Sequence, residues 1–531
     1  MITRAAVKDF LGELPLAAET YWFLRQPGKP VRGFFLKELQ AVLPAWRDQA
    51  EQAARTAPAG KRVLLFATLP YWISHATLLG LALAGLGHQV SLGYLPYGKW
   101  QKAVKPFDLR RHNLYARNLL RQAAPQLGAS SFLDVKPAQG RLPGELEQSI
   151  AEVSLRDTQY TLQVEEVSLE SELYRLRLAR NTAAASAALA WFQAERPEVV
   201  IIPNGTILEF GAVYRVARYL GIPVTTYEFG EQRQRIWLAQ DGEVMRQQTY
   251  ALWAARGRQG LAPAQLEQVQ ALFAARQRGG LWQNFARRWQ GVPSAGGEQA
   301  RAALGLDGRP VVLLATNVIG DSLTLGRQVF SDSMTGWLER SLGFFAGHPE
   351  AQLVIRIHPG ELVTRGPSVA QVVNRALPTG LPEHIHLVGA DAVLNTYDLV
   401  EIADLGLVYT TTVGLEMAMS GVPVIAIGQT HYRGKGFTLD PDSWEAYFTL
   451  LEHALSAPGK LRLSPEQVEL AWEYAYRFFF EYPHPFPWHM VHMWEDVDSW
   501  TLAQVLGQAG QAEFGTTFRY LVGEPVDWTS R

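Results

Sequence analysis

The sequence predicts an α/β protein built from two doubly wound domains, each with helices on both faces of a mainly parallel sheet. Short apolar runs alternate with helix-length segments from residue 61 and again from residue 309. The runs are continuously apolar, which is typical of strands buried on both faces. The chain has 531 residues, more than a single core usually supports, so two large domains are expected.

The first domain is expected to follow an N-terminal helical extension over residues 1–60, where apolar residues recur at helical spacing. Residues 102–190 are helical in character between two β-α-β units, which imply a parallel sheet. The elements predicted in these two units are a strand at "KRVLLFATLP", a helix at 72–84, a strand at "HQVSLGYL", a strand at 199–202, a helix at 208–220 and a strand at 223–227.

A stretch rich in Gln and Arg between Asp241 and Gly308 is expected to connect the domains. After it, five apolar runs separated by helices predict a second doubly wound sheet: "PVVLLAT", "AQLVIRIHP", "HIHLVG", "LGLVYT" and "VPVIAIG". The last segment is helical and very aromatic. The predicted boundaries are therefore 1–60, 61–300, 301–463 and 464–531.

Composition and missing motifs exclude several classes of function. The formal net charge of −2 argues against a general nucleic-acid binder, and the absence of cysteine excludes disulfides and cysteine-ligated metals. No secretion signal is recognised at the N-terminus, so we expect a cytoplasmic protein. The sequence has no P-loop, no Gly-x-Ser-x-Gly elbow and no Gly-x-Gly-x-x-Gly after the opening strand, and no Asp-x-Asp pair directly follows a predicted strand.

The stretch "VIRIHPGE", residues 354–361, supplies a candidate ligand-binding histidine. Pro359 stops the strand, so His358 should lie at the carboxyl edge of the sheet, where doubly wound folds bind ligands. Arg356 is two residues earlier and should share its face. We interpret His358 as a hydrogen-bond partner of a nucleotide phosphate. The alternative is a histidine that caps the following helix.

A second candidate wall is "YTTTVGLEM", which leads from a strand into a helix. The hydroxyls of Thr411 and Thr412 and the free amides of a helix start favour anions. Glu416 follows Thr412 by one helical turn and is placed to accept hydrogen bonds from ribose hydroxyls. A solvated helix residue is the alternative for Glu416.

The loop "GQTHYRGKGF" is a candidate clamp for a diphosphate or a sugar carboxylate. The chain has ten lysines, and none lies between Lys136 and Lys435 in this loop. Flanking glycines would let the backbone approach a ligand closely. A solvated surface loop is the alternative. The candidate side chains are His431, Tyr432, Arg433 and Lys435.

The loop "ATNVIGDSLT" follows the first strand of the second domain and offers Asn317, Asp321 and Ser322 at the same edge. These residues complete the expected donor side of the site. We expect the tips around residues 317, 358, 411 and 433 to converge into a single pocket that opens toward the other domain.

Equivalent loops of the first domain supply candidates for the acceptor side. Asn204 lies in "PNGT", and Glu228 and Glu231 lie in "TYEFGE". A catalytic base or nucleophile is sought among Glu228, Glu231 and His75.

Taken together, "TNVIGDS", "IRIHPGE", "PNGTILEFGAVYRVARYLGIPVTTYEFGE" and "TTTVGLEMAMSGVPVIAIGQTHYRGKGFTLDP" resemble the capsule polysaccharide biosynthesis glycosyltransferases, including the relatives that transfer Kdo. The resemblance is strongest over residues 309–457 and weaker over 196–231. It implies a GT-B-like fold, in which two Rossmann-like domains face a cleft and the C-terminal domain holds a nucleotide-sugar donor.

The resemblance implies a donor site that contains His358, Thr411, Thr412 and Glu416. It also implies that Arg433 and Lys435 contact the phosphate or the sugar. It implies a metal-independent enzyme without a cofactor. The final helices of such folds return to the first domain, which would explain the aromatic tail as packing across the domains.

The expected function is transfer of a sugar to a surface or capsular polysaccharide or a glycolipid. Alternatives are a nucleotide-sugar epimerase, a polyol-phosphate transferase, or an inactive binding or assembly subunit on the same fold. Peripheral association with the inner face of the membrane stays open, with the aromatic tail as the segment that would touch lipid. The donor, the acceptor and the stereochemical course are not specified by the sequence.

Overall fold

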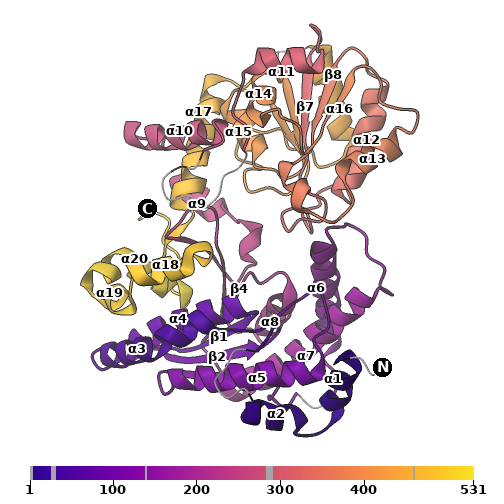
Figure 1. Cartoon of the computed structure of the whole chain (residues 1–531). Coiled ribbons are helices and arrows are strands. Elements are labelled where there is room, and N and C mark those ends of the chain that lie inside the picture. Colours follow the sequence, from indigo (N-terminus) through magenta and orange to yellow (C-terminus); the bar gives the residue numbers. More distant parts are fainter. Residues whose placement is uncertain are drawn as a thin grey trace. The chain divides into compact units, whose positions relative to one another are not determined.

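The chain forms two compact units in a computed structural model. The described residues are 4–25, 31–137, 140–280, 282, 291–457 and 461–530. The first unit consists of Met1–Thr158, Ser168–Met245 and His484–Val526, and the second of Gln159–Val167, Arg246–Pro483 and Asp527–Arg531. Each unit has its own sheet, and Figure 1 labels the helices and some of the strands.

The sheet of the first unit has the strand order β12-β6-β5-β4-β1-β2-β3. Strands β1 to β5 are parallel to one another, and β6 pairs antiparallel with β5. The order of the parallel strands reverses between β1 and β4, which makes this point the switch of a doubly wound sheet. The strands are β1 (Arg62–Thr68), β2 (Gln89–Leu95), β3 (Leu127–Ser131), β4 (Val199–Pro203), β5 (Val224–Glu228), β6 (Arg235–Gln240) and β12 (His484–Pro485).

Helices cover this sheet because its strands are apolar on both faces, as in β1, where every residue after Arg62 is buried. Helix α4 is buried from Trp72 to Gly85, so it lies in the interior of the unit. The helices of the first unit are α1 (Arg4–Glu13), α2 (Ala17–Arg25), α3 (Lys37–Ala54), α4 (Pro70–Gly85), α5 (Pro106–Leu120), α6 (Gly144–Leu162, to residue 158), α7 (Glu172–Glu195), α8 (Leu208–Tyr219), α18 (Met493–Ser499), α19 (Leu502–Leu506) and α20 (Gln508–Leu521).

The sheet of the second unit has the order β11-β10-β7-β8-β9, and all neighbouring strands are parallel. The order reverses between β7 and β10, so this unit is also doubly wound. The predicted pair of Rossmann-like domains is thereby confirmed. The strands are β7 (Val311–Ala315), β8 (Gln352–Arg356), β9 (Ile385–Val388), β10 (Leu405–Val408) and β11 (Val424–Ala426).

The core of the second unit lies between one face of this sheet and helices α12, α13 and α16, and Figure 1 shows α12 and α13 beside β8. Its centre is Trp337, which is fully buried and donates its indole N–H to Tyr447 Oη over 3.2 Å. The helices of this unit are α9 (Tyr250–Arg256), α10 (Pro263–Gln277), α11 (Gly297–Leu304), α12 (Met334–Ala346), α13 (Val369–Ala376), α14 (Thr396–Glu401), α15 (Val413–Met419), α16 (Trp444–Ser456) and α17 (Pro465–Tyr476).

The division between the units differs from the predicted boundaries. It falls between Met245 and Arg246 instead of at residue 300. The polar segment expected to be a connection contains α10, whose Val269, Leu272 and Phe273 are buried and which packs on α17. The buried apolar face of α10 was not recognised in the sequence because the segment as a whole is polar.

The aromatic tail is divided between the units. Helix α17 belongs to the second unit, whereas the segment from His484 joins the first sheet, where it pairs with Ile236. The expected return of the final helices to the first domain is therefore seen for residues 484–526. Within the described ranges, no helix combines the length and apolarity needed to cross a bilayer.

Candidate functional site

Three loops of the second unit are joined by hydrogen bonds at the carboxyl edge of its sheet. Asn317 Oδ1, after β7, accepts from the amide of Thr410, after β10, over 3.1 Å. Thr316 Oγ1 accepts from the amide of His358, after β8, over 3.2 Å. These contacts lie at the switch between β7 and β10, where doubly wound sheets bind ligands. Of the four tips predicted to converge, those at 317, 358 and 411 are thus joined within this unit, and a single pocket formed by all four stays a prediction.

His358 is the exposed member of this group. Its Nδ1 accepts a hydrogen bond from the amide of Gly360 over 2.9 Å, so the neutral ring carries its proton on Nε2. Surrounding protein lowers the pKa of His358, while the Asp321 carboxylate opposes that effect. The histidine caps the 3₁₀ turn Pro359–Val363, so the alternative predicted role is also real, but Nε2–H is left as a donor.

The remaining polar groups of this edge are partly accessible. Asp321 accepts from the amide of Ser322 over 2.6 Å, and burial raises the pKa of its carboxyl. Thr412 is half-buried and begins α15, whereas Thr411 is buried and its carbonyl accepts from Tyr432 Oη over 2.6 Å. Because α15 has only seven residues, the threonine hydroxyls matter more here than a helix dipole.

The proposed ribose-binding role of Glu416 does not fit its position. Glu416 is 3% exposed and its Oε1 lies 2.8 Å from Arg276 Nη2, which is also buried. Burial raises the pKa of Glu416, and the Arg276 guanidinium opposes the rise. Glu416 therefore forms a buried ion pair that joins α15 to α10, and ribose hydroxyls would have to displace Arg276.

Two predicted cationic contacts are also engaged within the protein. Arg356 donates to the Gly389 carbonyl and to Thr396 Oγ1, and Arg433 donates to the carbonyls of Ala426 and Pro441. Both arginines are buried. They fix backbone segments around the edge and do not present their charge to a ligand, because buried guanidinium groups are held by the acceptors they pair with.

His431 and Tyr432 are interior residues of the same loop. The imidazole of His431 stacks on Phe478 with centroids 3.8 Å apart, and its Nδ1 lies 3.0 Å from Tyr474 Oη. Burial lowers the pKa of His431 well below its ordinary value and raises that of Tyr432. Both rings are neutral and position the loop, so direct ligand contact by either is not supported.

Lys435 is unusual because it is a buried cation. Its side chain is 1% exposed, and Nζ has no hydrogen-bond partner among the described residues. The ammonium lies 3.8 Å from the ring centroid of Tyr250, a cation–π arrangement. Burial lowers its pKa to about 8. Lys435 is a charged residue of this loop that is closed off from solvent, so direct contact with a ligand would require the surrounding side chains to rearrange.

Polar side chains also lie together in the first unit, at the switch point of its sheet between β1 and β4. Asn204 donates from Nδ2 to Glu228 over 3.1 Å, and its Oδ1 accepts from the amides of Thr206 and Ile207. Glu228 also accepts from the following amide, that of Phe229, over 3.1 Å. These contacts hold the Glu228 side chain in one orientation, and a carboxylate is the form of a glutamate that acts as a base.

The backbone at this edge is strained at non-glycine residues. Positive φ angles occur at Leu69 after β1, at Asn204 and at Leu208, with values of 69°, 59° and 56°. Such conformations cost of order 1–3 kcal/mol each and gather at functional sites. Seven other described non-glycine residues also have positive φ, so the strain fixes the course of these loops and does not by itself mark a site.

The other two candidate bases have different positions. His75 has no exposed surface and is packed among Trp72, Tyr227, Phe229 and Phe486. Burial lowers its pKa to about 3, so it is a neutral core residue and not an accessible base. Glu231 is half-buried in the segment between β5 and β6.

Sequence reasoning missed several residues that build the edge. Thr316 directly follows the apolar run of β7, and this position at the end of a strand could have identified it as a residue of the edge. Arg276 was missed because its helix lies in the segment taken as a connection, 140 positions before Glu416. Leu69 and Leu208 give no sequence signal, because leucine ordinarily avoids positive φ.

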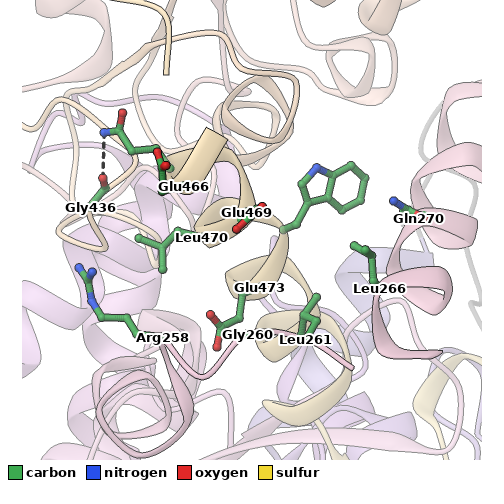
Figure 2. A pocket seen from close by; sticks show the side chains of 12 residues that line it. Arg258, Gly260, Leu261, Leu266, Gln270, Gly436, Glu466, Glu469, Leu470 and Glu473 are labelled. Atoms are coloured by element: carbon green, nitrogen blue, oxygen red, sulfur yellow. Dashed lines mark hydrogen bonds between the residues drawn. The ribbon is translucent and has the colours of Figure 1, made fainter. Parts of the chain in front are cut away.

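A separate cavity of about 720 Å³ lies in the second unit beside α10 and α17 (Figure 2). It is lined by none of the predicted site residues. Glu466, Glu469 and Glu473 line it together with Arg258, so its charge would oppose a diphosphate. In the described ranges, no group of three or more His, Asp or Glu side chains is arranged to hold a metal ion.

No protein-family model matches the sequence, and no curated protein sequence matches it. Similar solved structures include "Thermosulfurimonas dismutans KpsC, beta Kdo 2,4 transferase", at 18% identity over 59% of this chain and 88% of that chain, with a TM-score of 0.35. UDP-GlcNAc 2-epimerase from Neisseria meningitidis, bound to UDP-GlcNAc, is 15% identical over 80% of this chain and 99% of that chain, with a TM-score of 0.24.

The catalytic domain of starch synthase IV from Arabidopsis thaliana, bound to ADP and acarbose, is 11% identical over 84% of this chain and 99% of that chain, with a TM-score of 0.28. Kdo transferases, which the sequence resembles, are thus among the similar structures. Similarities at these identities and scores say nothing about the reaction, so the function must come from the residues themselves.

Proposed function

We propose that this chain is a metal-independent glycosyltransferase that moves a sugar from a nucleotide-sugar donor to a surface or capsular polysaccharide or a glycolipid. The observation that carries the proposal is the hydrogen-bonded junction of the loops after β7, β8 and β10, with His358 exposed upon it. A phosphate placed there would accept from His358 Nε2–H and from the Thr412 hydroxyl.

The second unit would hold the donor, and the first unit would hold the acceptor. Glu228, oriented by Asn204, is the proposed base that removes a proton from the acceptor hydroxyl as that oxygen attacks the anomeric carbon. The nucleoside diphosphate or monophosphate then leaves with the bonding electrons, and His358 stabilises the developing phosphate charge.

Binding and chemistry can be tested separately. A thermal-shift screen of CMP, UDP, GDP and dTDP and their sugar conjugates should give a concentration-dependent rise in Tm for one nucleotide class. Glu228→Gln should retain that rise but lose nucleotide release and glycan product. If no nucleotide raises Tm and His358→Ala changes nothing measurable, the enzyme proposal fails. An epimerised free nucleotide sugar as the product would instead assign the epimerase reaction.

A further inference from the structure

The N-terminal helices expose an unusual concentration of large apolar side chains. In the described part of the chain, 20 large hydrophobic residues are exposed, and 8 of them lie between residues 7 and 35. Phe10 is 63% exposed, Phe23 60%, Leu24 75% and Phe35 56%. Large apolar side chains left exposed at this density in one short segment indicate an interaction site.

The N-terminal helices already have one face packed against the rest of the unit. Ala18 and Trp22 of α2 are buried, and both α1 and α2 pack on α5. Gly12 of α1 lies so close to α5 that a Cβ there would be 2.8 Å from the amide nitrogen of Phe107. The helices are therefore apolar on an inner and an outer face, and the outer face needs an apolar partner of its own.

A lysine-rich loop lies against the N-terminal segment. Residues 96–105 connect β2 to α5, and the stretch 98–106 touches the N-terminal segment near both of its ends. A Cβ on Gly98 would lie 2.0 Å from the carbonyl oxygen of Gly33, and a Cβ on Gly12 would lie 3.2 Å from Cβ of Pro106. Lys99 and Lys102, between these ends, are exposed.

The charge of this region contrasts with that of the whole chain. Residues 4–25, 31–35 and 98–106 contain seven Lys and Arg and three acidic residues, although the chain carries a formal net charge of −2. Eight of the ten lysines lie within the first 136 residues. Exposed lysine beside exposed aromatic and leucine side chains is the chemistry that binds an anionic bilayer surface.

We propose that α1, α2, residues 31–35 and the loop 98–106 form a membrane-docking face for the cytoplasmic surface of an anionic bilayer. The apolar side chains enter the headgroup and acyl boundary, and Lys99 and Lys102 contact anionic headgroups. The loop follows the carboxyl end of β2, the edge of the same sheet at which Asn204 and Glu228 lie. Docking by this face would present that edge to a lipid-linked molecule. The docking itself does not depend on the transferase reaction.

The test is flotation of the full-length protein with vesicles of phosphatidylcholine alone or with about one-third phosphatidylglycerol. The wild type should float with the anionic vesicles and much less with the neutral ones. Lys99→Gln/Lys102→Gln should reduce the partition coefficient on anionic vesicles by about 25-fold, because each lysine near such a surface is worth roughly fivefold. Phe10→Ser/Phe23→Ser/Leu24→Ser should reduce it more than tenfold on the same vesicles.

Matched controls use exposed apolar residues elsewhere. The controls are Leu169→Ser and Val393→Ser, at residues whose side chains are 57% and 85% exposed. Both variants should float as the wild type does. A wild type that stays at the bottom of the gradient, or face variants that float unchanged, would overturn the proposal. So would a concentration-dependent dimer in sedimentation velocity that the face variants abolish, because the face would then belong to a second copy. No donor or acceptor is present, so the result is independent of the proposed transferase activity.

Discussion

Replacing Lys435 with methionine should stabilise the protein, which is the reverse of the usual effect of a core substitution. Methionine keeps the apolar stem of the side chain and removes an ammonium that is 1% exposed and without a hydrogen-bond partner in the described structure. The pKa of Lys435 is about 8, compared with an ordinary value of 10.5. Carrying the charge at neutral pH therefore costs about 3 kcal/mol, at ~1.4 kcal/mol for each tenfold change in the acid constant.

The pH dependence of the stabilisation by Lys435→Met is the more specific test. Between about pH 8 and 10.5 the unfolded chain binds this proton and the folded chain does not, so wild-type stability rises with pH across that window. Lys435→Met lacks this dependence. Its advantage in chemical denaturation should be about 3 kcal/mol at pH 7 and should disappear near pH 10.5.

Lys102→Met, at an exposed lysine, is the control and should stay within about 0.5 kcal/mol of the wild type at each pH. A destabilised Lys435→Met protein, or a difference that does not change between pH 8 and 10.5, would refute the reasoning. A charge retained at this cost also predicts a role at the donor edge. Stabilisation with unaltered nucleotide affinity would show that Lys435 has no such role.

Three further predictions concern the candidate site. His358→Ala should weaken nucleotide binding, measured by calorimetric titration, by about 10- to 150-fold, which is the value of a hydrogen bond to a charged group. His358→Asn should restore the hydrogen bond to the Gly360 amide, and with it the melting temperature, but should not restore the affinity. Glu416→Gln should destabilise the second unit by about 3–5 kcal/mol in urea, because it removes the carboxylate that neutralises the buried Arg276 guanidinium. A loss below about 1 kcal/mol would contradict the ion pair. Asn204→Ala should lower kcat by about tenfold or more with little change in nucleotide affinity, since it releases the Glu228 carboxylate; an equal loss of both would place Asn204 in donor binding instead.

The sequence by itself determined the two sheets and the edges that carry the candidate residues. Continuous apolar runs such as that of β1 are buried on both faces, and the polar residues that follow β7, β8 and β10 meet at one edge because parallel strands end together. His358 and Asn317 were predictable for that reason.

Only the tertiary structure decided which of those residues face solvent. Arg356, Arg433 and Glu416 have the chemistry of ligand contacts, yet all three are engaged inside the protein. Arg433 donates to carbonyls seven and eight positions away, whereas Arg356 and Glu416 are held by residues 33 and 140 positions away. The partner of Glu416 is Arg276, from a helix that composition alone assigned to a connection. Burial and charge pairing depend on which distant segments pack together, and local sequence patterns do not contain that information.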